Sequence, residues 1–184
     1  MTDTRALLIQ SAILIFNEDL SSPLEKVAEQ ANMTRRTLHR YFKDRKELMD
    51  SCETEVQKAC LAALTTAYGS SEDPLKKLEN MFFAGLNCGI KHAFLHKLHN
   101  AVNHDHNRNY QRCSEYDKIF SMWERVLDSL HAQKLIGVSI NIHWVQNLFN
   151  GIMTATIQSR NSGSMSTVEI QKYAWYSFSK GIGL

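Results

Sequence analysis

The chain has 184 residues, of which 43% are hydrophobic and 22% are charged, and its formal net charge is +2. This composition is ordinary for a globular protein, and so small a net charge does not by itself indicate binding to nucleic acid. Gly and Pro are scarce, at 8 and 2 residues, and long stretches have helical spacing. These features favour an all-α fold over a β-sandwich or a β-barrel.

Cysteine usage and the lack of targeting signals indicate the compartment. The four cysteines, Cys52, Cys60, Cys88 and Cys113, lie far apart and form no Cys-x-x-Cys pair. Such a pattern is typical of reduced thiols in a cytosolic protein. The first residues lack the basic region of a signal peptide, and no apolar run approaches the ~20 residues of a membrane span. We therefore expect a cytoplasmic protein without a membrane partner.

Apolar residues recur at helical intervals along most of the chain, with polar segments between them. The pattern predicts helices at about residues 3–18, 23–31, 34–42, 45–68, 74–91, 93–100, 110–134, 141–159 and 166–180. A polar loop is expected at about residues 103–109. No internal repeat or low-complexity segment interrupts this series.

Several predicted helix ends carry specific signals. Ser22–Glu25, Asp44–Glu47 and Ser166–Glu169 each have the spacing of a capping box, in which the first side chain accepts from a backbone N–H and the last reaches back. Asn32 suits the left-handed conformation that ends a helix, because only Gly adopts it more readily. Gly137 is expected to end the helix that begins near residue 110.

The two short helices at about 23–31 and 34–42 have the arrangement of a helix-turn-helix, with Thr34 as N-cap of the second. A small core is expected between them, in which Ala28 allows a close crossing. Its members are Val27, Ala28, Leu38 and Phe42.

Positive charge is concentrated at the second of these helices. Residues 33–46 hold six basic residues and one acidic residue, although the whole chain nets only +2. Such a local excess is the electrostatic footprint of a nucleic-acid binder, since Arg can grip guanine and Thr, His and Tyr can donate to phosphates. A solvated basic helix face is the alternative.

The order and spacing of these residues carry a resemblance. Residues 5–48 resemble the DNA-binding domain of the TetR family of transcriptional regulators. The matching positions are Arg5, Leu8, Ile9, Ala12, Ile15 and Phe16, Val27-Ala28, Ala31-Asn32-Met33-Thr34, Thr37-Leu38-His39-Arg40-Tyr41-Phe42 and Arg45-Lys46-Glu47-Leu48. The chain departs from the family where His39 replaces a usual Tyr, where Arg45 replaces a usual Lys, and in a shorter loop after the first helix.

The resemblance implies a DNA-binding domain at residues 1–48 and a helical effector-binding and dimerisation domain at 49–184. It implies a homodimeric repressor, released from a pseudo-palindromic double-stranded DNA operator by a small-molecule effector. An activator with the same fold is left open. The implied DNA-binding residues are Thr34, Arg35, Arg36, Thr37, His39, Arg40, Tyr41, Lys43 and Arg45.

The second domain contains no motif, so its sites also follow from the resemblance. The last two helices are expected to pair with their mates in a four-helix dimer interface, with Trp144, Leu148, Ile152, Tyr173 and Tyr176 as candidate contacts. An effector pocket is expected within residues 75–135, lined by Phe82, Leu86, Phe94, Tyr116, Phe120 and Trp123. For each of these aromatic and aliphatic residues, a place in the subunit's own core is the alternative.

Histidines form one further pattern. His92, His96 and His99 share one face of a helix, and His92 with His96 has the spacing of a zinc-binding pair. We expect no metal site, because exposed histidines on such a helix are commoner, but a metal-responsive regulator remains an alternative. No Gly-rich phosphate loop, nucleophile elbow or His-Glu-x-x-His occurs, so we expect neither an enzyme nor a cofactor. A helical interaction module without DNA binding is the last alternative.

Overall fold

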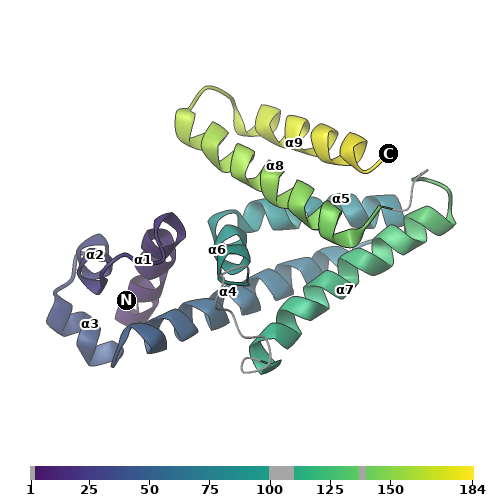
Figure 1. Cartoon of the computed structure of the whole chain (residues 1–184). Helices are drawn as coiled ribbons and strands as arrows, with labels where there is room; N and C mark the ends of the chain where they lie inside the picture. The colour runs from purple at the N-terminus through teal and green to yellow at the C-terminus, as the bar shows by residue number, and fades with distance from the viewer. Residues whose placement is uncertain (1–2, 100–109, 137–139) are drawn as a thin grey trace. The chain divides into compact units, whose positions relative to one another are not determined.

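The computed structural model describes residues 3–99, 110–136 and 140–184, without the side chains of residues 90, 92, 95, 96, 99 and 110–116. Within these ranges it contains nine α-helices and no strand, so the predicted all-α fold is confirmed. The helices are α1 (Thr4–Glu18), α2 (Leu24–Gln30), α3 (Arg35–Tyr41), α4 (Arg45–Tyr68), α5 (Pro74–Cys88), α6 (Ile90–His99), α7 (Tyr110–Ala132), α8 (Ile142–Ser162) and α9 (Thr167–Gly181) (Figure 1).

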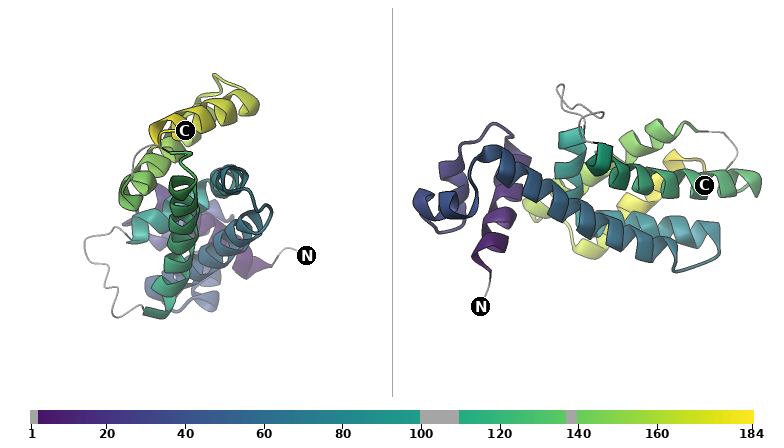
Figure 2. Two further views of the ribbon diagram at one scale, coloured as in Figure 1. Left: turned by 90° about the vertical axis from the view of Figure 1, so that its right-hand side faces the viewer. Right: turned by 90° about the horizontal axis from the view of Figure 1, so that it is seen from below.

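The chain divides into two compact units. The first consists of residues 1–58 and 90–104, and the second of residues 59–89 and 105–184. In the first unit α1 packs against α2 and α6, and α2 packs against α3. In the second unit α5 packs against α7, while α8 and α9 lie side by side as a hairpin (Figure 2). The domain boundary expected at residue 48 stays a prediction.

The core of the first unit consists of apolar side chains from α1 to α4, including Leu8, Phe16, Leu38 and Leu48, none of which is exposed. Cys52 lies in this core, where its thiol donates to the Ile9 carbonyl at a sulfur–oxygen distance of 3.7 Å. Burial raises the pKa of the Cys52 thiol to about 12. Since the thiolate is the reactive form, this cysteine is a structural residue.

The core of the second unit is aromatic. The Phe82 ring stacks on Phe178 with centroids 4.8 Å apart and meets Phe149 edge-on at 5.5 Å. Trp123 joins them, 5.5 Å from the Phe149 centroid. The packing is close enough that a Cβ on Gly85 would lie 2.6 Å from Cζ of Phe149. Helices α5, α7, α8 and α9 are therefore joined by side chains that fit one another's shape.

Most predicted helix ends are confirmed, and the exceptions have local causes. The capping box at Ser22 is wrong: α2 starts after Pro23 without a side-chain cap, and the Ser22 hydroxyl donates to Asp19. The Asp19 carboxylate also accepts from the hydroxyl and backbone N–H of Ser21, at 2.7 and 2.8 Å. These bonds, led by that from the Ser21 side chain, lower the pKa of Asp19.

Two breaks along the chain differ from the predictions. Helix α5 ends at Cys88 rather than near residue 91, because Gly89 takes a positive φ of 47°, and α6 then begins at Ile90. Helix α7 ends at Ala132 because Lys134 has a φ of 58°, so the chain leaves the helix before Gly137, which lies outside the described residues. Near the C-terminus α8 runs to Ser162, about three residues beyond the predicted end.

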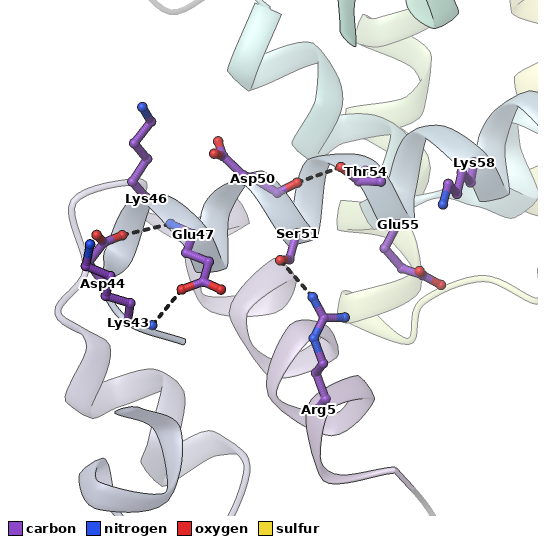
Figure 3. A pocket seen from close by; sticks show the side chains of 10 residues that line it. All are labelled: Arg5, Lys43, Asp44, Lys46, Glu47, Asp50, Ser51, Thr54, Glu55 and Lys58. Carbon is purple, nitrogen blue, oxygen red and sulfur yellow. Dashed lines mark hydrogen bonds between the residues drawn. The ribbon is translucent and has the colours of Figure 1, made fainter. Parts of the chain in front are cut away.

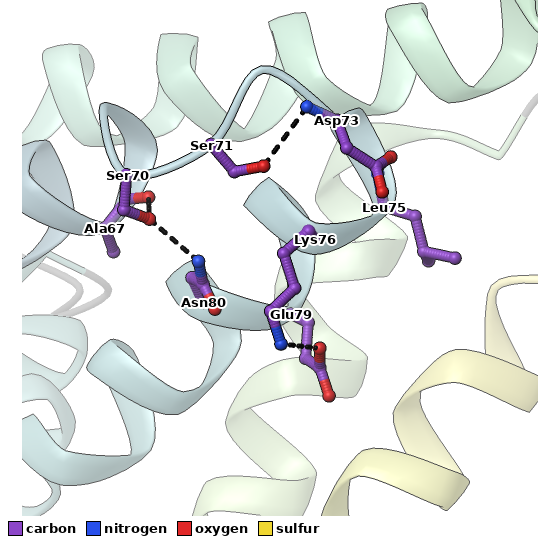
Figure 4. A network of polar contacts seen from close by, with 8 residues as sticks. All are labelled: Ala67, Ser70, Ser71, Asp73, Leu75, Lys76, Glu79 and Asn80. Carbon is purple, nitrogen blue, oxygen red and sulfur yellow. Dashed lines mark hydrogen bonds and ion pairs between the residues drawn. The ribbon is translucent and has the colours of Figure 1, made fainter.

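The turn between α4 and α5 shows how short polar side chains connect two helices (Figure 4). The Ser70 hydroxyl donates to the Ala67 carbonyl at 2.6 Å and accepts from the Asn80 amide at 2.7 Å. The Asp73 carboxylate caps α5 by accepting from the Leu75 N–H at 3.0 Å, with Pro74 as the first helical residue. Asp73 and Pro74 therefore define the start of α5.

Candidate nucleic-acid interface

Helices α2 and α3 are joined by a short turn. Asn32 adopts the left-handed conformation, with φ of 54°, as its side-chain type predicts. The Met33 N–H donates to the Ala28 carbonyl at 2.8 Å, and the Asn32 N–H donates to the Glu29 carbonyl at 2.9 Å. These bonds satisfy carbonyls at the end of α2 and reverse the chain within one turn.

Side chains and a cap fix α3 after that turn. The Thr34 hydroxyl accepts from the Thr37 N–H at 3.1 Å, which confirms the predicted N-cap. The expected small core is also present, because each of its four members is buried, at 2% exposure or less. These residues are Val27, Ala28, Leu38 and Phe42. A helix of seven residues is too short to be stable alone, so these contacts hold it in place.

The polar side chains of α3 face outward. Arg35, Arg36, His39 and Arg40 are exposed, whereas Thr37 and Tyr41 are half-buried. The guanidinium of Arg40 lies over the Tyr41 ring, 5.1 Å from its centroid. Lys43 follows the helix and is also exposed. The first unit therefore presents a compact set of cations on one short helix.

One cation of α3 is held by neighbouring side chains. The Arg35 guanidinium forms an ion pair with Glu25 on α2, with a nitrogen–oxygen distance of 2.8 Å. Its Nε also donates to Nε2 of His39 at 3.4 Å. Glu25 was not among the predicted site residues, and no sequence signal links it to Arg35, because only the helix crossing brings the two together.

Arg45 differs from the other predicted DNA-binding residues. Its two terminal nitrogens donate to the backbone carbonyls of Leu20 and Ser22, and its guanidinium lies 4.5 Å from the centroid of the Phe16 ring. Arg45 thus ties the start of α4 to the loop between α1 and α2. Its neighbour Lys46 is exposed. Arg45 was expected to face DNA and Lys46 was not, because the spacing of two adjacent residues does not determine which side chain points outward.

A polar groove of about 520 Å³ lies beside the first turns of α4 (Figure 3). The Arg5 guanidinium enters it from α1 and donates to the Ser51 hydroxyl at 3.0 Å. The Asp44 carboxylate caps α4 by accepting from the Glu47 N–H, and Glu47 accepts from the Lys43 N–H rather than from Asp44, so only half of the predicted box forms. The lining contains four basic and four acidic residues and therefore has no net charge. It comprises Arg5, Lys43, Asp44, Lys46, Glu47, Asp50, Ser51, Thr54, Glu55 and Lys58.

A second outward face lies on the hairpin of α8 and α9, and it is apolar. Trp144 is 62% exposed, Tyr173 53% and Tyr176 63%. Leu148 and Ile152 are half-buried, and with Gly151 and Ala155 they line a shallow apolar groove on α8. The candidate dimer contacts thus lie on one continuous hairpin, and three of them are large aromatic side chains in contact with water. Such a face indicates a partner surface.

No protein-family model matches the chain, and no curated protein matches it. Solved structures do. The TetR-like regulator LfrR from Mycobacterium smegmatis, in complex with proflavine, matches with a TM-score of 0.71 and 20% identity, over 97% of this chain and 96% of that one. The TetR-family regulator PfmR from Thermus thermophilus matches with a TM-score of 0.69 and 15% identity, over 100% of this chain and 98% of that one.

The chain has the TetR-family fold. The match extends over nearly the whole chain, so the fold includes the second unit as well as the helix-turn-helix. The resemblance was carried by residues 5–48, but it also predicted the fold of residues 49–184, which contain no sequence motif.

The predicted pocket residues of this TetR fold fall into different surroundings. Phe82, Leu86 and Trp123 belong to the second unit and are at least nine-tenths buried, while Phe120 is half-buried, 5.4 Å from the His143 ring centroid. Phe94 belongs to the first unit, on α6. The side chain of Tyr116 lies outside the described residues. Phe82, Phe94 and Trp123 thus contribute to core packing, which was the stated alternative, and the effector pocket stays a prediction.

The histidine pattern noted in the sequence stays untested, because the side chains of His92, His96 and His99 lie outside the described residues. Among the side chains that are described, no group of three or more His, Cys, Asp or Glu residues is arranged to hold a metal ion. In the described part of this TetR fold, no helix is both long and apolar enough to cross a membrane.

Proposed function

We propose that this chain is a DNA-binding transcriptional regulator that occupies a pseudo-palindromic operator as a homodimer and leaves it when a small molecule binds. The observation that carries the proposal is the capped, outward-facing set of cations on α3, within a fold otherwise found in TetR-family regulators. A DNA operator also implies that the protein acts in the cytoplasm.

The DNA contacts divide by side-chain chemistry. Arg35, Arg36 and Thr37, in the first turn of α3, face the base edges, where Arg can contact guanine O6 and N7 bidentately. His39, Tyr41 and Lys43 contact the phosphate backbone, together with Thr34 at the helix cap; Arg40 serves either purpose. We add Lys46, which is exposed beside Lys43. Arg45 contributes by positioning α4, because its terminal N–H groups donate within the fold.

The apolar face of α8 and α9 supports the homodimer. A two-fold axis brings residues close to it near their own copies, so a charged residue at the axis would face a like charge. Residues 141–159 contain no Asp, Glu, Lys or Arg, although 22% of the chain is charged. We assign Trp144, Leu148, Ile152, Tyr173 and Tyr176 to this interface.

The small-molecule effector belongs in the second unit, against the aromatic side chains Phe82, Phe120 and Trp123. One neighbour of this fold was solved in complex with proflavine, which supports a ligand-binding role for the fold. Release follows if the effector favours a conformation in which the two α3 helices no longer match the operator spacing.

Fluorescence polarisation tests the proposal. The purified chain is titrated against a labelled duplex spanning the intergenic region upstream of its gene, and against a scrambled duplex, from low to moderate salt. We expect preference for the upstream duplex and an affinity that falls steeply with salt, because phosphate contacts release counterions. Absence of binding to either duplex at low salt would favour a helical interaction module instead.

A further inference from the structure

An acidic residue lies within the proposed DNA-binding surface. Glu25, in the first turn of α2, forms an ion pair with Arg35 at 2.8 Å, and their side chains are 44% and 66% exposed. A carboxylate beside a polyanion is unfavourable unless a cation neutralises it. Any role of Arg35 on this surface therefore depends on its ion pair with Glu25.

Arg35 is restrained on two sides. Glu25 binds one terminal nitrogen from α2, and Nε2 of His39 accepts from Nε one helical turn along α3. The guanidinium is a planar fork with further N–H donors on the other terminal nitrogen. Those donors stay available, and the orientation in which they are presented is set by Glu25 and His39.

Stability does not explain the pair. An exposed ion pair contributes little to the stability of a fold, and α2 and α3 are already joined by the buried Val27, Ala28 and Leu38. The larger consequence concerns Arg35, whose long side chain otherwise samples many rotamers and can reach any nearby phosphate.

From these contacts, and resting on the proposed DNA-binding function, we propose that Glu25 is a positioning residue that sets the sequence specificity of Arg35. A phosphate in non-specific DNA must compete with Glu25 for the guanidinium. A guanine edge offers two acceptors to the donors that Glu25 and His39 leave available, so this contact does not require the loss of the carboxylate. Glu25 thereby suppresses non-specific contacts by Arg35 more than specific ones.

The chain offers a matched control. Glu29 is another exposed carboxylate on α2, so Glu29→Gln removes the same charge from the same helix as Glu25→Gln. Both variants and the wild type are titrated against a duplex that the wild type enriches from a random pool, and against a scrambled duplex. If only the loss of charge matters, the affinity for both duplexes rises about equally. If positioning of Arg35 is lost, the affinity for the scrambled duplex rises selectively.

We expect Glu25→Gln to lower the ratio of specific to non-specific affinity by about 3- to 10-fold relative to Glu29→Gln, with the same thermal midpoint. In an Arg35→Ala background the two variants should no longer differ, because Glu25 acts only through Arg35. Equal ratios for Glu25→Gln and Glu29→Gln in the wild-type background would overturn the inference.

A measurement without DNA separates the inference from the proposed function. The Nε–Hε signal of Arg35 in NMR should exchange faster with water in Glu25→Gln and stay unchanged in Glu29→Gln. Unchanged exchange in both variants would contradict the positioning role. A wild-type protein that enriches no duplex would overturn the proposed function, and the specificity role with it.

Discussion

The surface of α3 and the face of α8–α9 are both uncovered in a single chain, but their chemistry is opposite. Helix α3 has seven residues and exposes Arg35, Arg36 and Arg40. The α8–α9 face exposes Trp144, Tyr173 and Tyr176, and residues 141–159 carry no formal charge. Exposed residues therefore have a different role on each surface. The cations of α3 suit contact with a polyanion, and the apolar face of α8–α9 suits contact with a second copy of the chain.

Their structural supports differ as well. Helix α3 is fixed by the Thr34 cap, a short turn and a few small apolar contacts. Helices α8 and α9 rest on the stacked aromatic core around Phe82 and Phe178. A charge placed on the apolar face should therefore affect assembly and leave the subunit folded. A change on α3 should affect DNA binding alone.

The largest effect is expected from a charge on the apolar face. Trp144→Glu should convert the proposed homodimer into monomers, because each copy then places a carboxylate in an apolar interface. Operator affinity should then fall by about 100-fold or more, since each half-site is bound separately. Sedimentation velocity gives the mass and fluorescence polarisation the affinity. Gln146→Glu is the matched control on α8, outside the groove lining, and should remain dimeric; a dimeric Trp144→Glu would refute the assignment.

The next effect concerns α3. Arg36→Ala should weaken binding to the operator by about 1–3 kcal/mol and leave binding to a scrambled duplex much less affected, because a base contact is lost. Arg160→Ala removes the same charge from an exposed position near the end of α8 and should change neither. Equal losses on the operator and the scrambled duplex would assign Arg36 to phosphate instead.

A smaller effect tests the aromatic core beneath the apolar face. Gly85→Ala should destabilise the subunit by about 1–3 kcal/mol, because its Cβ would lie 2.6 Å from the Phe149 ring. Gly151→Ala meets no atom within 4 Å, and removing a helical glycine there should stabilise the subunit by up to about 1 kcal/mol. Urea unfolding in the Trp144→Glu background measures the free energy of unfolding of both variants without a contribution from dimerisation. Similar free energies for the two variants would show that the core relaxes around Gly85.

The smallest effect compares two predicted caps. Ser166 accepts from the Glu169 N–H at 3.3 Å, and Glu169 reaches back to the Ser166 N–H at 2.9 Å, so the box is complete. Ser166→Ala should cost about 1 kcal/mol of unfolding free energy. Ser22→Ala should cost less, because Ser22 caps no helix and its only described side-chain bond, to Asp19, is 3.4 Å long. Thermal unfolding of both variants measures the loss of stability. Equal losses would indicate that Ser22 caps α2 after all.

Local signals predicted most helix ends because the relevant forces act within a few residues. The Thr34 cap, the left-handed Asn32 and the box at Ser166 need no distant contact. The predictions were wrong where a neighbour competes: Asp19 takes the Ser22 hydroxyl, and Lys134 turns the chain before Gly137.

The candidate site was predicted in part. Charge and residue type indicated α3, whereas the inward direction of Arg45 and the Glu25–Arg35 pair depend on how α1, α2 and α4 pack. Aromatic residues at helical spacing could not be divided between pocket and core, because both environments favour the same side chains. Phe94 shows the difficulty, since the chain places it in the first unit.

We propose that two copies of α3, related by a two-fold axis, recognise DNA together. Enrichment of duplexes from a random pool by the full-length protein tests this most directly. We expect a pseudo-palindrome whose half-sites have centres about one helical turn or slightly more apart, roughly 34–36 Å or more. Enrichment of an asymmetric single site would contradict the two-fold pairing. A pool that stays random at low salt would contradict DNA recognition itself.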